Sequence, residues 1–214
     1  VYHDTGSTLT YVSGNLPNYD LREIGFTSEV EVVFPKKISS HCPPTPQFFG
    51  THFLSASLFG FHSPSTSSTT DYTFQDPDVS VQVYSVRIAE ESKTVYFLMS
   101  ASFGTGQGVV LTSSIFPETY ADKKWNFSVA VKPSKFPIAE SVTGSASSSY
   151  TLEFYGVNKE IDVTVNSFIL SESVTYAQGI SIVSAPKRYY AGAHRTNFTG
   201  TVSENTDVKL GAVR

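Results

Sequence analysis

The sequence predicts an all-β fold, an antiparallel β-sandwich built from two sheets. Segments with alternating polar and apolar residues recur along the chain, and a period of two is typical of strands with one buried face. Val, Thr, Ser, Tyr and Phe dominate these segments, and such residues favour strands over helices. Gly, Pro, Ser and Asp separate the segments at intervals of roughly a dozen residues, which favours a sandwich or jelly roll.

The first half of the chain supplies three of the predicted strands. Residues 28–35 alternate polar and apolar side chains, and residues 80–88 place Val81 and Val83 on one face. Residues 94–102 form a more continuously apolar run. Such a run predicts a strand that is buried on both faces.

The second half begins with the strongest alternation, at residues 125–133. No helix longer than two turns is expected, although residues 116–125 fit one short turn before this strand. Further strands are predicted at residues 150–157, 160–170, 180–185 and 207–214. The residues predicted to form the core are Trp125, Phe127, Val129, Phe154 and Phe168.

Composition limits the class of protein. The chain has 214 residues, of which 40% are hydrophobic and 16% charged, and this fits a single sandwich domain over residues 26–214 with residues 1–25 as an N-terminal arm. The formal net charge of −4 argues against nucleic-acid binding and against docking to anionic membranes. No apolar run approaches the ~18 residues of a spanning helix, so no membrane insertion is expected.

The cysteine and the two ends of the chain give further expectations. Cys42 is the only cysteine, so no internal disulfide can form, and a metal site on His41 and Cys42 lacks further ligands at suitable spacing. We expect a free or inert thiol. The chain starts without Met and stops abruptly after residues 207–214, which suggests a domain cut from a longer polypeptide.

The order of segments in the second half points to a family. The Trp125–Val131 strand is followed by "YTLEFYGVNKEID", then by "KRYYAGAHRTNFTG" and last by "TDVKLGAVR". This order resembles the laminin-G-like branch of the concanavalin A-like lectin/glucanase superfamily over residues 95–214. The resemblance implies a turn in which Gly192, Phe198 and Gly200 lead into a closing strand. The last two segments also resemble such domains in large structural proteins of bacteriophages and other large viruses.

The stretch "GAHRTNFTG", residues 192–200, is the main candidate site. One interpretation is a glycine-bounded turn between strands, whose polar side chains satisfy loop carbonyls. A second is a contact between subunits. A third is a rim loop that presents planar polar groups beside aromatic rings to a sugar or a protein. The residues of this candidate ligand site are Tyr189, Tyr190, His194, Arg195 and Asn197.

A calcium site is a second candidate. Residues 71–78 contain Asp71, Asp76 and Asp78, and carboxylate oxygens are the ligands that Ca²⁺ prefers. The family resemblance implies Ca²⁺ at a rim of the sandwich. The alternative interpretation is three solvated turn aspartates, since their spacing matches no specific calcium loop. No other cofactor is expected.

Catalytic motifs are sparse. Glucanases of the superfamily carry three acids at alternate positions of one strand, whereas here Glu160 and Asp162 are followed by Thr164. Hydrolysis needs two carboxylates on either side of the scissile bond. The chain also lacks the G-x-S-x-G and H-E-x-x-H motifs. From the sequence we therefore expect a protein that is not an enzyme.

The function expected from the sequence is a non-catalytic structural or attachment domain of a larger viral protein. It would lie in the virion and contact other segments or subunits of its own assembly. One alternative is a carbohydrate-binding, lectin-like module of an extracellular host-recognition or adhesin protein, with glycans as partners. A second alternative is a glycoside hydrolase that uses Glu160 and Asp162.

Overall fold

The computed structural model describes residues 2–4, 25–36, 54–63, 79–89, 92–104, 106–134, 149–195 and 202–214. One sheet, called sheet A, has six strands in the order β1 (Tyr2–Asp4), β10 (Arg188–Ala191), β3 (Ser55–His62), β4 (Val79–Arg87), β5 (Val95–Phe103) and β6 (Gly108–Thr112). Sheet B has five, in the order β13 (Lys209–Val213), β2 (Phe26–Phe34), β7 (Lys123–Pro133), β8 (Tyr150–Glu160) and β9 (Val163–Val174). A separate ribbon pairs β11 (His194–Arg195) with β12 (Val202–Glu204).

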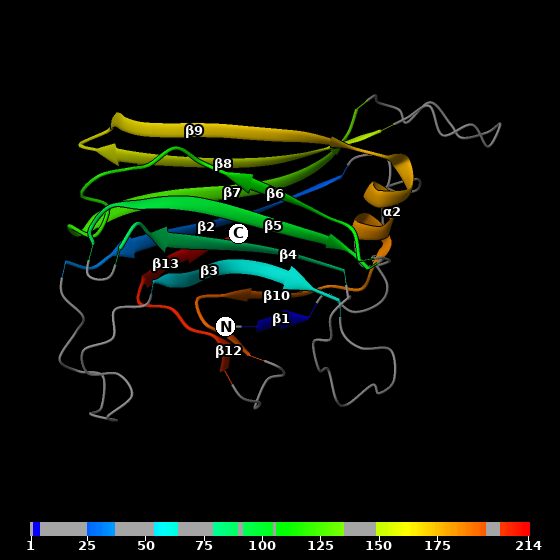
Figure 1. Ribbon diagram of the computed structural model, residues 1–214, viewed down its shortest axis with the longest axis horizontal. Coiled ribbons are helices and arrows are strands. Elements are labelled where there is room, and N and C mark those ends of the chain that lie inside the picture. The colour runs from blue at the N-terminus through cyan, green and yellow to red at the C-terminus, as the bar shows by residue number, and fades with distance from the viewer. Residues whose placement is uncertain are drawn as a thin grey trace, which may run out of the picture.

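The two sheets pack face to face, and every strand pair within them is antiparallel. In Figure 1, β3, β4 and β5 lie in front of β2, β7 and β13. The prediction of an antiparallel two-sheet β-sandwich is therefore confirmed.

Most of the predicted strands are present, with shifted ends. The run at 94–102 corresponds to β5, but β5 alternates between buried and half-buried residues and is not buried on both faces as predicted. Phe97, Met99 and Ala101 face the core, whereas Leu98 and Ser100 lie on the outer side of sheet A. The strand predicted from residue 160 begins at Val163, because Ile161 and Asp162 form the hairpin turn with φ of 48° and 64°.

The strand predicted at 180–185 is wrong, because this segment belongs to helix α2 (Tyr176–Ser184). Thr175 caps the helix in a capping box with Gln178, and buried Gly179, Ile182 and Val183 share one face of the helix. Ile180 and Ile182 flank Ser181, and this alternation is typical of a strand, whereas the capping box at Thr175 indicates a helix. Within the described residues, no helix is long and apolar enough to cross a membrane.

The core between the sheets is a layer of aromatic rings. Trp125 and Phe127 of β7 stack with their ring centroids 5.6 Å apart, and Phe97 of β5 meets them at 4.8 and 4.7 Å. Phe168 of β9 packs against this layer, since Gly156 leaves room for its ring. The prediction of a core around Trp125, Phe127, Val129, Phe154 and Phe168 is confirmed, with Phe168 only partly buried.

A buried ion pair links the two sheets near one end. Arg87 at the end of β4 donates to Asp207, which immediately precedes Val208 and β13, across 2.8 Å, and both side chains are at most 4% exposed. The Tyr120 hydroxyl donates to the same carboxylate across 2.6 Å, and the Arg87 guanidinium lies 3.4 Å above the Tyr120 ring centroid. Burial and the adjacent Asp207 carboxylate raise the pKa of Tyr120, so this hydroxyl remains a donor.

We predict that Asp207→Asn lowers the free energy of unfolding by roughly 3–5 kcal/mol, because it removes the carboxylate from a buried guanidinium. Urea denaturation measures this loss. Glu118→Gln is the control, since the Lys93–Glu118 pair is exposed, and its cost should stay below about 1 kcal/mol. Equal stability of Asp207→Asn and the parent would contradict the prediction.

Candidate functional site

The outer face of sheet A carries polar side chains in two rows that cross the strands. Residues paired in register share one face of a sheet, and their neighbours in sequence point to the other face. The first row contains Arg188, His62, Ser80 and Ser102, and the second contains Tyr190, Gly60, Gln82 and Ser100. The neighbouring Phe61, Val81 and Ala101 belong to the core. We call this outer surface the polar face.

One end of the polar face holds a cluster of rings. Gly192, with φ of +80°, turns the chain after β10, and His194 stacks on Tyr190 with ring centroids 4.2 Å apart and planes at 13°. His62 of β3 lies 4.8 Å from His194, centroid to centroid. Residue 60 has to be glycine, since a Cβ there would clash with the backbone carbonyl oxygen of Val81 and would also lie 2.8 Å from the Tyr190 hydroxyl oxygen.

Hydrogen bonds connect this cluster to β4. The Tyr84 hydroxyl donates to Gln82 Oε1 across 2.6 Å, and Gln82 Nε2 lies 3.4 Å from His194 Nδ1. On the other side, His62 Nδ1 lies 3.3 Å from the carbonyl oxygen of Ser63. We use the name histidine cluster for His62, Gln82, Tyr84, Tyr190 and His194.

Both histidines of the cluster are neutral at pH 7. Burial lowers the pKa of His62 to about 4; the hydrogen bond to Ser63 opposes this shift and the positive charge of Arg188 adds to it. Burial and the neighbouring His62 lower the pKa of His194 to about 3. Each ring therefore carries one N–H donor and one acceptor nitrogen.

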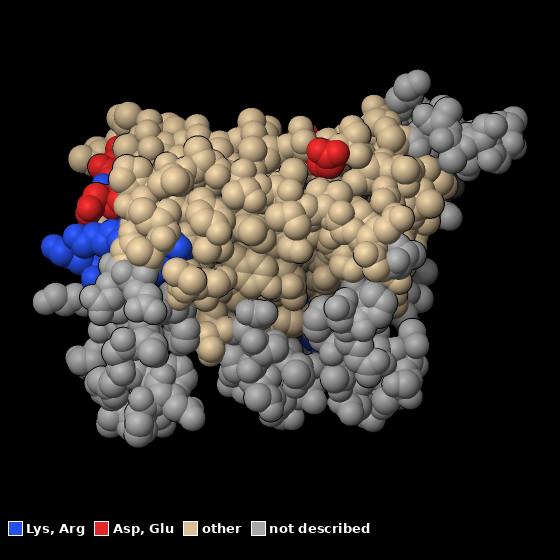
Figure 2. Space-filling model, viewed as in Figure 1, with Lys and Arg blue, Asp and Glu red and all other residues tan. Residues whose placement is uncertain are grey.

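The polar face becomes more accessible from β10 toward β6. His62, Tyr190 and His194 are at most 3% exposed, Gln82, Tyr84 and Ser100 are half-buried, and Val110 of β6 is 60% exposed. Figure 2 shows no acidic or basic side chains over the middle of the molecule, while the charged side chains gather mainly at one end. The accessible part of this face is therefore uncharged and rich in hydroxyl and amide groups.

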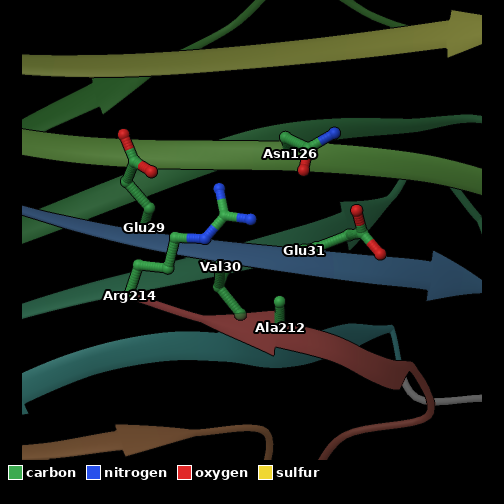
Figure 3. Close-up of a pocket in the computed structure, with 6 residues that line it drawn as sticks. All are labelled: Glu29, Val30, Glu31, Asn126, Ala212 and Arg214. Carbon is green, nitrogen blue, oxygen red and sulfur yellow. The ribbon is translucent and has the colours of Figure 1, made fainter.

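A small hollow lies on the opposite side of the molecule, on the outer face of sheet B (Figure 3). It is lined by Glu29, Val30, Glu31, Asn126, Ala212 and Arg214, and the figure shows the Arg214 side chain between the two glutamates. Lys124 lies 3.1 Å from Glu31, and the backbones of Glu29 and Arg214 exchange two hydrogen bonds of 2.9 Å. The hollow forms where β13 ends beside β2, and none of the predicted site residues line it.

The structure brings together two of the five predicted ligand residues, Tyr190 and His194. Tyr189 does not join them, which corrects the prediction: consecutive strand residues face opposite sides, and its ring packs 5.5 Å from Phe61 on the core side. Arg195 is described only as part of β11, and Asn197 lies outside the described residues. The proposed calcium ligands Asp71, Asp76 and Asp78 also lie outside them.

Sequence reasoning missed three members of the histidine cluster. His62 is the last residue of β3, and Gln82 and Tyr84 belong to the strand predicted at residues 80–88, but no motif distinguishes any of the three. The available signal was the polar half of the alternation at 80–88, which carries Ser80, Gln82 and Tyr84 on one face. Nothing in the sequence shows that this face meets His194, 112 residues away from Gln82.

The carboxylates considered for hydrolysis lie at a hairpin end, away from the polar face. Glu160 ends β8 and forms an ion pair with Lys123, whereas Asp162 occupies the exposed turn before β9. Among the described residues, no group of three or more His, Cys, Asp or Glu side chains is placed to hold a metal ion. The geometry does not place Glu160 and Asp162 on the two sides of a cleft.

No protein-family model and no curated protein matches this chain. A solved structure that matches is an alginate lyase from Pseudomonas aeruginosa, with 11% sequence identity and a TM-score of 0.44, covering 94% of this chain and 68% of that one. These findings give no support to a laminin-G-like or viral assignment. At this level of similarity no residue role or substrate is carried over to this chain.

The match contradicts one expectation from the sequence, that this protein is not an enzyme. The protein that it matches is named as an enzyme. The expectation rested on missing motifs, and a site assembled from β3, β4, β10 and β11 leaves no motif in a continuous stretch of sequence. The exclusion of catalysis is not retained.

We predict that the free energy of unfolding falls as the pH drops from about 6.5 toward 4, because the unfolded chain then binds protons that the folded histidine cluster does not. The His62 shift alone corresponds to a loss on the order of 3 kcal/mol. Urea denaturation at a series of pH values measures this slope. In His194→Gln the slope should be smaller, and an unchanged slope would rule out a neutral buried His194.

Proposed function

We propose that the polar face of sheet A binds carbohydrate. The observation that carries this proposal is the uncharged array of Gln82, Tyr84 and Ser100, which leads into the stacked Tyr190 and His194. Sugars offer many hydroxyl groups and apolar ring faces, so their sites combine fixed polar groups with aromatic side chains. A glycan-binding module of an extracellular protein is the setting that this surface favours.

The strands hold these polar groups at fixed spacing. Neighbouring strands lie about 4.8 Å apart, so Gln82 on β4 and Ser100 on β5 present hydrogen-bonding groups at regular steps across the sheet. A sugar chain that crosses β4 and β5 would meet one hydrogen-bonding side chain of this row on each of the two strands. The buried histidines beside this array are neutral at pH 7, so they add no charge to the surface that a sugar would meet.

We predict that the chain binds a glycan and that Gln82→Ala weakens this binding at least tenfold, which corresponds to about 1.4 kcal/mol. A glycan array with Ca²⁺ and with chelator finds the ligand, and calorimetry measures its affinity. Dependence on Ca²⁺ would support the predicted aspartate site at Asp71, Asp76 and Asp78.

The matched control for this experiment is Asn126→Ala, which removes a half-buried amide from sheet B and should leave the affinity unchanged. A silent array would contradict the proposed function. So would equal affinities of Gln82→Ala and the parent, provided that the melting temperatures agree.

A second candidate is the structural role in a larger assembly, such as a virion. β9 forms an edge of sheet B, and an edge strand offers N–H and C=O groups for pairing with another chain. Three of its outward side chains are apolar, with Val163, Val165 and Ile169 exposed by 64%, 49% and 66%, and Tyr155 of β8 lies next to Ile169. Partners would be other segments or subunits of the same assembly.

This second candidate predicts self-association through β9. Val165→Lys combined with Ile169→Lys should convert an associating protein into a monomer, because two charges on the face would have to be buried. Sedimentation velocity over a range of concentrations measures the association. Val110→Lys, which alters an equally exposed valine on β6, should associate like the parent. A parent that stays monomeric at every concentration would exclude this role.

A further inference from the structure

The hydrogen bonds that connect Tyr84 to Gln82 and Gln82 to His194 have a defined order of donors and acceptors. A glutamine side chain has an oxygen that only accepts hydrogen bonds and a nitrogen that only donates them. The contact between Tyr84 and Gln82 is 2.6 Å long, which fits O–H···O bonds and is shorter than the usual N–H···O distance. Gln82 therefore turns its oxygen toward the Tyr84 hydroxyl.

This orientation determines what His194 does. The Gln82 nitrogen faces His194 Nδ1 at 3.4 Å, and since this nitrogen can only donate, Nδ1 has to accept. The proton of the neutral imidazole is then on Nε2. His62 has the opposite arrangement, because its Nδ1 faces the carbonyl oxygen of Ser63, which can only accept.

We propose that Gln82, held by Tyr84, is a positioning residue that fixes His194 as the Nε2–H tautomer. This proposal rests on the proposed carbohydrate site, in which the half-buried Gln82 faces the ligand while the buried His194 lies behind its amide. The two neighbouring rings thus carry opposite tautomers at a centroid distance of 4.8 Å.

Nuclear magnetic resonance of the ¹⁵N-labelled full chain tests this without any ligand. Long-range ¹H–¹⁵N correlation spectra distinguish the protonated from the unprotonated nitrogen of each histidine ring. At pH 7, His194 is expected as the Nε2–H tautomer, and His62 in the same spectrum as the Nδ1–H tautomer. Observation of His194 as the Nδ1–H tautomer would overturn the proposal.

Variants then test the role of Gln82. In Gln82→Glu a carboxylate that only accepts faces Nδ1, so the proton should move to Nδ1 of His194 while His62 stays unchanged. In Tyr84→Phe the amide loses its anchor and both tautomers of His194 should appear, which provides a second variant if the glutamate disturbs folding. The control is Gln107→Glu, an equal change of charge at an exposed position. An unaltered His194 spectrum in both Gln82→Glu and Tyr84→Phe would reject the positioning role.

The outcomes separate this inference from the proposed function. A silent glycan array together with the expected tautomers would remove the carbohydrate role and leave the orientation of the cluster intact. Glycan binding by a chain whose His194 has the Nδ1–H tautomer would keep the function and remove the inference.

Discussion

The alternation of faces along the strands of sheet A is the constraint on which the site depends. Phe61 and Val81 enter the aromatic core, so His62 and Gln82 have to lie on the outer face. A shift of one residue in strand register would exchange the two sets and bury the polar one in the core. The packing of the core thus determines where the cluster lies and which residues belong to it.

The buried ion pair of Arg87 and Asp207 connects this arrangement to the second sheet. Arg87 ends β4, the strand that carries Gln82 and Tyr84, whereas Asp207 precedes β13 at the edge of sheet B. The C-terminal segment is also held to β3, since Ser57 N donates to the Asn205 carbonyl oxygen across 2.8 Å. The same contacts therefore secure the closing strand and two strands beneath the polar face.

The sequence predicts the fold better than the site, for physical reasons. Periodicity is local, and it identified strands such as 80–88 and 125–133 directly. It failed at α2, where the apolar residues Ile180 and Ile182 fit a strand and the cap at Thr175 carried the decisive signal. Tyr190 and His194 were found because one short stretch contains both. His62 and Gln82 approach them only through strand pairing, which a single sequence does not encode locally.

The polar cluster could also serve only to specify strand register, as buried polar groups do in some proteins. Other residues already specify this register. Phe59, Phe61, Val81 and Val83 have to face the core, and this requirement alone fixes how β3 pairs with β4. A leucine would stabilise the sheet where a neutral, buried histidine weakens it in acid. The position of the two histidines beside an accessible, uncharged polar surface therefore agrees with the ligand site that we propose.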